Sequence, residues 1–160
     1  MNERKYKVYM MGAVSGEDGP KTRDLRARLG DIIVRRQHQL LSPHVAYDFE
    51  QTTFREKIGG LDNICGANLA LMDQAEVFIA EGSGASEGRG FEVAFGLLVK
   101  MCPVLYLREE KWGRGTSMIF GNSHPLLYVA MYNQENLESV FDQAIERVPV
   151  MLENLRKVTK

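Results

Sequence analysis

A glycine-rich loop followed by a lone carboxylate is the part of this sequence best suited to chemistry. Residues 81–90 read Glu-Gly-Ser-Gly-Ala-Ser-Glu-Gly-Arg-Gly, and the four glycines let the backbone approach a ligand closely. Ser83 and Ser86 add hydroxyl groups. A helix expected to begin near Phe91 adds free N–H groups that carry a partial positive charge. This combination favours the binding of a phosphate group over a plain turn.

Glu92 is the single carboxylate in the apolar run 91–99. In the first turn of a helix, an acidic side chain stabilises the helix by about 0.3–1 kcal/mol, which is reason enough for its presence. Beside the glycine-rich loop, however, the same position places an ionised carboxylate next to a bound ligand. Such a group is suited to act as a nucleophile or to stabilise a cation.

The same loop also imitates a dinucleotide-binding fingerprint, because Gly82, Gly84 and Gly88 follow an expected strand and precede an expected helix. The glycine spacing differs from that fingerprint by one residue, and the loop does not belong to the first strand–helix–strand unit. The sequence contains no nucleophile elbow, no Walker loop and no metal-binding spacing of its three histidines. We therefore expect neither a metal nor an organic cofactor.

Strand and helix patterns alternate along the chain and must position these residues. The apolar runs are continuous rather than alternating, which predicts strands buried on both faces of a parallel sheet. The expected strands are 6–11, 39–42, 77–80, 104–107 and 126–132, and the expected helices are 25–33, 54–73 with a break at Gly59–Gly60, 91–99 buried all round, and 137–148.

This order predicts an α/β fold with a doubly wound, five-stranded parallel sheet in three layers, of Rossmann-like or flavodoxin-like type. Ligands in such folds bind beyond the carboxyl ends of the strands, at the point where the strand order reverses. The loops to consider are then 12–19, 81–90 and 108–117.

Length and charge narrow the classes of function. The 160 residues predict a single domain over 1–160, and 20 basic against 21 acidic side chains argue against nucleic acid as a partner. No apolar run approaches about 18 residues, so we expect no membrane span. Cys65 and Cys102 match no metal spacing and are interpreted as reduced thiols, which predicts a cytoplasmic protein.

Four segments resemble the nucleoside 2-deoxyribosyltransferase superfamily, and a fifth is similar to its 2'-deoxynucleoside 5'-phosphate N-hydrolase (Rcl-type) branch. The block that ends in Glu92 is the most specific of them, and the resemblance extends over residues 7–132. The four segments are 9–12 (YMMG), 43–46 (PHVA), 75–81 (AEVFIAE) and 86–92 (SEGRGFE), and the fifth is 115–121 (GTSMIFG).

The resemblance implies a hydrolase that splits the N-glycosidic bond of a nucleoside 5'-monophosphate, releasing free base and sugar 5-phosphate. Glu92 falls on the family's catalytic glutamate, and Tyr9 on a tyrosine near it. The substrate-binding positions that the resemblance implies are Gly12, Gly16, Ser86 and Gly88 around the phosphate, His44 and Ile64 beside the base, and Thr116 with Ser117 at the phosphate of a neighbouring subunit. A homodimer with shared active sites is therefore implied as well.

Two departures from the family pattern bear on the chemistry. Phosphate-loop positions that are commonly Ser and Arg in this branch are Ala13 and Ser15 here, so that Lys21 or Arg23 would have to supply a positive charge. The family aspartate that handles the leaving base aligns with Asn68, and an amide can hydrogen-bond a base but cannot protonate it.

Three functions stay open at this level. The first is the N-glycosidase, in which a carboxylate stabilises an oxocarbenium-like state at the sugar and water takes the glycosyl group. The second is a nucleoside 2-deoxyribosyltransferase, in which another base takes it. The third is a non-catalytic nucleotide-binding module of the same fold, which the departures at Ser15 and Asn68 would favour.

Overall fold

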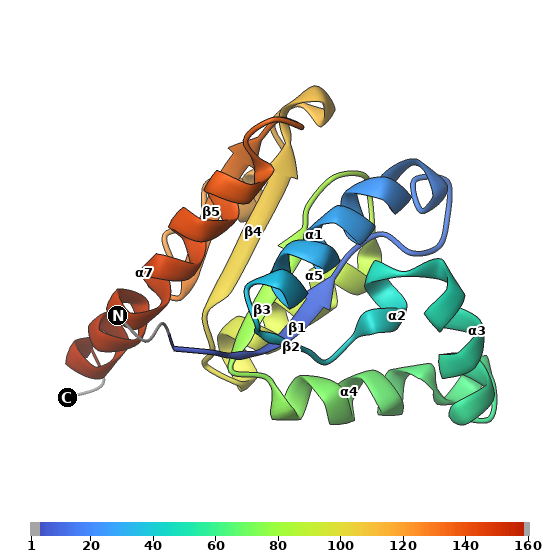
Figure 1. Ribbon diagram of the computed structural model, residues 1–160. Helices are drawn as coiled ribbons and strands as arrows, with labels where there is room; N and C mark the ends of the chain where they lie inside the picture. The colour runs from blue at the N-terminus through green and yellow to red at the C-terminus, as the bar shows by residue number, and fades with distance from the viewer. Residues whose placement is uncertain (1–3, 159–160) are drawn as a thin grey trace.

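A computed structural model describes residues 4–158, so the first three and the last two residues of the predicted domain lie outside the described residues. Its centre is a five-stranded sheet in which every pairing is parallel, with strand order β2-β1-β3-β4-β5 (Figure 1). The strands are β1 (Lys7–Met11), β2 (Gln39–Leu40), β3 (Val77–Glu81), β4 (Val104–Glu109) and β5 (Leu127–Tyr132). The predicted five-stranded parallel sheet is confirmed, and the strand order is the flavodoxin-like one.

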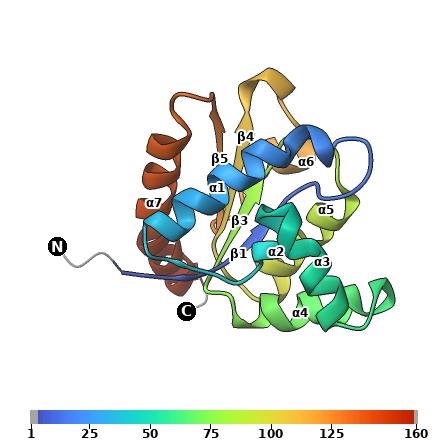
Figure 2. The same ribbon diagram turned by 45° about the vertical axis from the view of Figure 1, so that its right-hand side comes forward.

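Helices cover both faces of the sheet, which makes three layers (Figure 2). Right-handed crossovers place α1 on one face and α4 and α5 on the other, because the chain moves in opposite directions after β1 and after β2. The last helix, α7, packs against α1 and β5. The helices are α1 (Arg23–Arg35), α2 (Pro43–Ala46), α3 (Asp48–Lys57), α4 (Ile64–Gln74), α5 (Glu87–Ala94), α6 (Ser117–Phe120) and α7 (Leu137–Val158).

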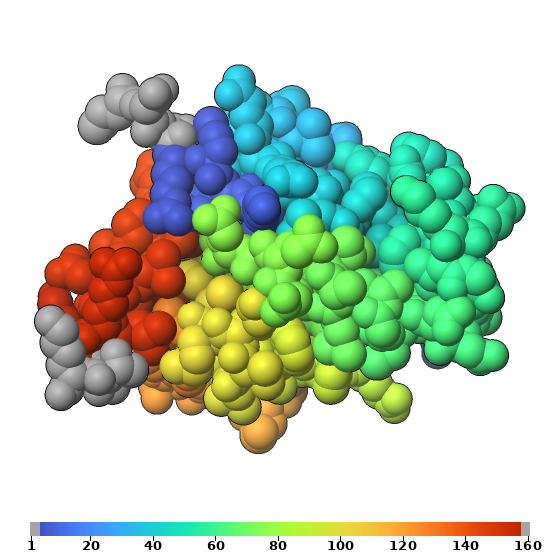
Figure 3. Space-filling model, turned by 90° about the horizontal axis from the view of Figure 1, so that it is seen from below, coloured from blue at the N-terminus to red at the C-terminus, as the bar shows by residue number. Residues whose placement is uncertain are grey.

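The core lies where the continuous apolar strands predicted it. All five residues of β3 are fully buried, and so are the residues of β1 after Lys7. The edge strand β5 is only half-buried over most of its length. From below, α7, the segment around residue 100 and α4 lie side by side across the molecule (Figure 3). Within residues 4–158 there is no helix of the length and apolarity that a membrane span requires.

The helix expected at 91–99 differs from the prediction in three respects. Its regular part, α5, ends at Ala94, and Phe95–Val99 continue as a π-helical turn. It begins four residues earlier, at Glu87, because the Ser86 hydroxyl accepts a hydrogen bond from the Arg89 backbone N–H (3.2 Å) and caps the first turn. It is also not buried all round, since Phe91 and Leu98 are 54% and 68% exposed. The helix belongs to an outer layer and buries only its inner side against the sheet.

The predicted break at Gly59–Gly60 is confirmed. Both glycines have positive φ, 78° and 115°, which separates α3 from α4 at a backbone geometry that side chains disfavour. The first of the two helices begins at Asp48, six residues before the expected start. Together α2, α3 and α4 form the long crossover from β2 to β3.

The sheet reverses its strand order between β1 and β3. The chain leaves β1 for the α1 face and leaves β3 for the α5 face, so the two loops diverge above the carboxyl ends of these strands. A crevice at this edge is therefore a consequence of the topology.

Two helix glycines should respond oppositely to alanine. A Cβ on Gly30 in α1 would lie 2.6 Å from Ala46 Cβ and 3.1 Å from Tyr47 Oη, whereas a Cβ on Gly66 in α4 meets nothing within 4 Å. We expect Gly30→Ala to lower the free energy of unfolding by about 1–3 kcal/mol through overpacking. Gly66→Ala should raise it by about 0.5–1 kcal/mol, the usual gain from replacing a helix glycine. Urea unfolding measures both, and a stabilised Gly30→Ala would contradict the described packing of α1 on α2.

Candidate active site

A cavity of about 520 Å³ opens at the reversal point of the sheet. One wall comes from the loop after β1, a second from α2 and α4, and a third from the β3–α5 loop with the start of α5. The lining residues are Gly12, Val14, Ser15, Gly16, His44, Val45, Ile64, Asn68, Ala85, Ser86, Glu87, Gly88, Arg89 and Glu92. Nine of these are predicted site residues from four separate segments of the chain, so the fold brings most of the predicted site together.

Glu92 and Tyr9 form a hydrogen-bonded pair at the floor of this cavity. The Tyr9 hydroxyl donates to Glu92 Oε1 at 2.7 Å, and the tyrosine itself is completely buried. Burial and the adjacent Glu92 raise the pKa of Tyr9, so that it remains a protonated donor. The hydroxyl therefore fixes the orientation of the carboxylate.

The environment of Glu92 corrects one expectation. Because α5 begins at Glu87, Glu92 lies in the second turn, and the helix terminus is not what determines its charge state. Burial raises the pKa of Glu92 to about 7, although the bond from Tyr9 and the charge of Arg89 both act to lower it. The carboxyl group is thus close to half-ionised at neutral pH rather than held ionised.

His44 and Asn68 form the opposite wall. His44 Nε2 lies 3.1 Å from Asn68 Oδ1, and the imidazole stacks on Phe54 with ring centroids 3.6 Å apart. Burial lowers the pKa of His44 to about 4, so the ring is neutral at pH 7. A neutral ring that donates from Nε2 to Asn68 Oδ1 leaves the amide N–H groups of Asn68 available to a ligand. Ile64 adds an apolar surface to the same wall.

The loop after β1 and the loop after β3 are tied to each other. Asp18 Oδ2 accepts a hydrogen bond from the Ala85 backbone N–H at 2.8 Å, and a Cβ on Gly84 would clash with the Asp18 side chain. The N–H groups at the start of α5, on Glu87 and Gly88, have no partner within the helix. They border the cavity, together with the Ser86 hydroxyl.

Positive side chains are scarce around this cavity. Among the described residues that line it, Arg89 alone carries a positive charge, and its guanidinium is engaged by loop carbonyls. The two candidates for a compensating charge lie elsewhere: Lys21 pairs with Glu17 and Asp18, and Arg23 pairs with Asp48. An anion in this cavity would therefore be held by neutral donors.

Comparisons with known proteins bear on the fold. No protein-family model and no curated protein sequence matches the chain. The structure of the Clostridium botulinum CMP N-glycosidase BcmB has the same fold. The two share 14% sequence identity with a TM-score of 0.53, over 86% of this chain and 97% of that one. At this identity the likeness establishes the architecture alone.

Thr116 and Ser117 are not brought to the Glu92 cavity within one chain. Both side chains are exposed, and Thr116 Oγ1 caps α6 by accepting a hydrogen bond from the Met118 N–H (3.3 Å). Thr116 lines a neighbouring hollow of about 380 Å³, beside Arg108 and Trp112. Their assignment to a second subunit's site stays a prediction.

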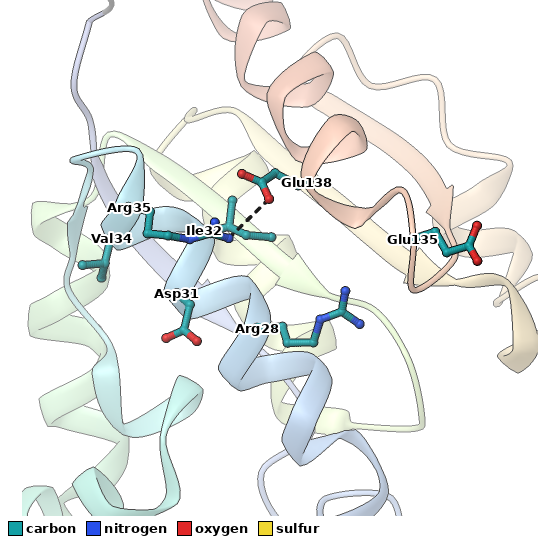
Figure 4. A pocket seen from close by; sticks show the side chains of 7 residues that line it. All are labelled: Arg28, Asp31, Ile32, Val34, Arg35, Glu135 and Glu138. Atoms are coloured by element: carbon teal, nitrogen blue, oxygen red, sulfur yellow. Dashed lines mark hydrogen bonds and ion pairs between the residues drawn. The ribbon is translucent and has the colours of Figure 1, made fainter.

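Another hollow, of about 360 Å³, lies between α1 and the segment that enters α7 (Figure 4). Its charged side chains are of both signs, and Arg35 pairs with Glu138 across it at 3.4 Å. None of the predicted site residues lines it. We therefore assign candidate chemistry to the Glu92 cavity.

Three residues of this region were not predicted from the sequence as contributors to the site: Arg89, Asp18 and Phe54. Ser86, a residue type preferred at the N-cap of a helix, was a usable signal for the earlier start of α5. The contacts of Asp18 and Phe54 join segments 67 and 10 residues apart in sequence, and no local pattern indicates them.

The raised pKa of Glu92 predicts how stability varies with pH. A carboxyl group with a pKa near 7 in the folded state and about 4.5 when unfolded contributes stability below pH 4.5, and this contribution is lost as the pH rises through 7. We expect Glu92→Gln to be more stable than the wild type by about 3 kcal/mol at pH 8, with the difference disappearing by pH 4.5.

Urea unfolding at several pH values measures this difference. Glu153→Gln, an exchange of the same kind at an exposed position of α7, serves as the control and should follow the wild-type curve. If the free energy of unfolding varied with pH in the same way for wild type and Glu92→Gln, Glu92 would not be desolvated in the folded state.

Proposed function

We propose that this protein is an N-glycosidase acting on nucleoside 5'-monophosphates. The observation that carries the proposal is the Tyr9–Glu92 pair, a half-buried and oriented carboxylate facing a cavity with hydrogen-bonding groups on two other walls. The resemblance of the block ending in Glu92 to the N-hydrolase branch supports it. The likeness of the fold to a CMP N-glycosidase is consistent with it.

The carboxylate supplies the central step. Ionised Glu92 faces C1' of the sugar and attacks it as the C1'–N bond breaks, and the bonding electron pair leaves with the base. Positive charge that develops on the sugar is stabilised by the same carboxylate in a site shielded from water. Water then attacks C1' of the glycosyl ester, which releases the sugar 5-phosphate and regenerates Glu92.

Asn68 and His44 act on the base in this proposal. The Asn68 amide donates a hydrogen bond to the leaving base and stabilises the electron pair that the base receives, while the neutral His44 holds the amide in place. Because neither group is an acid at neutral pH, the departing base takes its proton from water. Ile64 packs against the base.

Neutral donors hold the 5'-phosphate. The N–H groups of Glu87 and Gly88 point along the axis of α5, where the helix dipole favours an anion, and the Ser86 hydroxyl adds a third donor. Gly12, Ser15 and Gly16 close this side of the cavity with backbone. Dephosphorylated nucleosides should therefore be much poorer substrates.

A homodimer with shared active sites belongs to the same proposal. It rests on the resemblance of residues 115–121, which assigns Thr116 and Ser117 to the phosphate of the neighbouring subunit. Sedimentation at micromolar concentration tests it, and a monomer would overturn the shared site without affecting the chemistry of Glu92.

The decisive experiment measures base release. The protein is incubated with a panel of ribo- and deoxyribonucleoside 5'-monophosphates, and free base is quantified by chromatography. Glu92→Gln keeps the size of the side chain but removes the charge, and we expect a loss of about 10²–10³-fold in kcat. Glu153→Gln, on the far end of α7, is the control for an exchange of the same kind.

Each outcome of this experiment distinguishes between the three candidate functions. Base release that requires an added free base would favour the transferase. Binding of monophosphates without any base release would favour the non-catalytic module. Near-normal turnover by Glu92→Gln would exclude the proposed mechanism.

Tyr9→Phe tests the pairing separately. Loss of the hydroxyl removes a hydrogen bond that lowers the pKa of Glu92. The pKa should therefore rise, and the acid limb of the pH dependence of kcat/KM should shift to higher pH. A hydrogen bond to a charged group contributes about 1.5–3 kcal/mol, which corresponds to a decrease of about 10–150-fold in kcat/KM at pH 7. An unchanged pH profile would show that Tyr9 does not act on Glu92.

A further inference from the structure

Arg89 is a buried cation whose hydrogen bonds all go to one loop. Its side chain lies at the third position of α5 and is 5% exposed. Nη1 donates to the carbonyl oxygens of Glu81 and Ser83, each at 3.0 Å, and Nη2 donates to that of Gly84 at 2.5 Å. The guanidinium thus lies under the β3–α5 loop and donates hydrogen bonds to three carbonyl groups, one at the end of β3 and two in the loop.

This arrangement determines the shape of the loop. The carbonyl groups of residues 81, 83 and 84 accept hydrogen bonds from one cation, and Gly84 bends the chain with a φ of 70°, a conformation that glycine adopts readily. The loop then continues to Ser86 and the first N–H groups of α5, on the side of the cavity. The guanidinium also lies 5.7 Å from the centre of the Tyr106 ring, behind the loop.

Arg89 is also the neighbour of Glu92 on the same helix, three residues before it. The groups that face Glu92 are the Tyr9 hydroxyl from β1, the neutral His44 and the amide of Asn68 across the cavity, and Glu87 and Arg89 from α5. Arg89 is the one positive charge in this set.

We propose that Arg89 is a positioning residue of the active site, which holds the β3–α5 loop so that the first N–H groups of α5 and the carboxylate of Glu92 face the bound nucleotide together. In this role it contacts neither phosphate nor sugar, because Nη1 and Nη2 donate to the loop carbonyls. The inference rests on the proposed function for the identity of the substrate. The fork geometry of the Arg89 guanidinium holds the loop, whereas its positive charge acts on Glu92.

Two variants separate these contributions. Arg89→Lys keeps the positive charge but replaces the planar fork by a single ammonium group, which cannot hold three carbonyls in the same geometry. Arg89→Met keeps a long apolar stem and removes both. KM and kcat are measured for a monophosphate and its nucleoside, together with the pH dependence of kcat/KM and the melting temperature.

We expect both variants to raise KM for the monophosphate about tenfold and to leave KM for the nucleoside nearly unchanged. The acid limb of the pH profile should stay in place for Arg89→Lys and move upward by about one pH unit for Arg89→Met, where the positive charge near Glu92 is lost. If Arg89→Met does not fold, the split between the two KM values in Arg89→Lys decides.

Arg36→Lys is the matched control. The Arg36 guanidinium is also held in a fork geometry, by Asp142 of α7, but it does not line the Glu92 cavity. We expect it to lower the melting temperature without changing the ratio of the two KM values. A lowered melting temperature in the Arg89 variants, with an unchanged KM ratio and pH profile, would overturn the proposal.

Failure of the proposed function is recognised separately, because wild-type protein would then release no base from any monophosphate. In that case calorimetric binding of a nucleoside monophosphate and NMR titration of Glu92 replace the kinetic readouts. Weaker binding by Arg89→Lys and a raised Glu92 pKa in Arg89→Met would still support the positioning role. Unchanged binding and titration in both variants would overturn it.

Discussion

The parallel pairing of β1 with β3 is the constraint on which the rest of the structure depends. It sets Tyr9 opposite Phe78 and brings the loops that follow Met11 and Glu81 to the same edge of the sheet. Because the chain leaves these two strands toward opposite faces, the loops diverge and a cavity remains between them. Tyr9 then reaches Glu92 across 83 residues of sequence.

The electrostatics of the cavity follow from what surrounds it. Glu92 is half-buried, with one tyrosine donor and a single nearby cation, and its pKa is near 7. This pKa suits a carboxylate that must be ionised to attack the sugar and must be released again when water cleaves the glycosyl ester. Neutral imidazole and amide groups on the opposite wall can polarise a base without donating a full proton. In the proposed reaction, Glu92 is therefore the group on which bond cleavage depends.

The two loops above the sheet are held by the charged side chains of Arg89 and Asp18. Arg89 binds the carbonyls of the β3–α5 loop from within, and Asp18 joins that loop to the one after β1. Below them the buried Glu81 accepts a hydrogen bond from Tyr132 at 2.9 Å, with a pKa raised by burial. Arg89 and Glu81 are buried, and they contribute to a defined loop conformation because each would be costly to leave without its partners.

The sequence by itself determined the sheet, its parallel sense and the edge at which the cavity lies, because continuous apolar runs and glycine-rich loops are local patterns. It also indicated Glu92, a lone carboxylate in an apolar run, and the break at Gly59–Gly60. It did not determine the charge state of Glu92 or the exposed side of α5, since burial depends on which layers cover a helix. The partners of Arg89, Asp18 and His44 were decided only by tertiary structure, because their contacts require backbone turns and strand pairings that no short segment of sequence encodes.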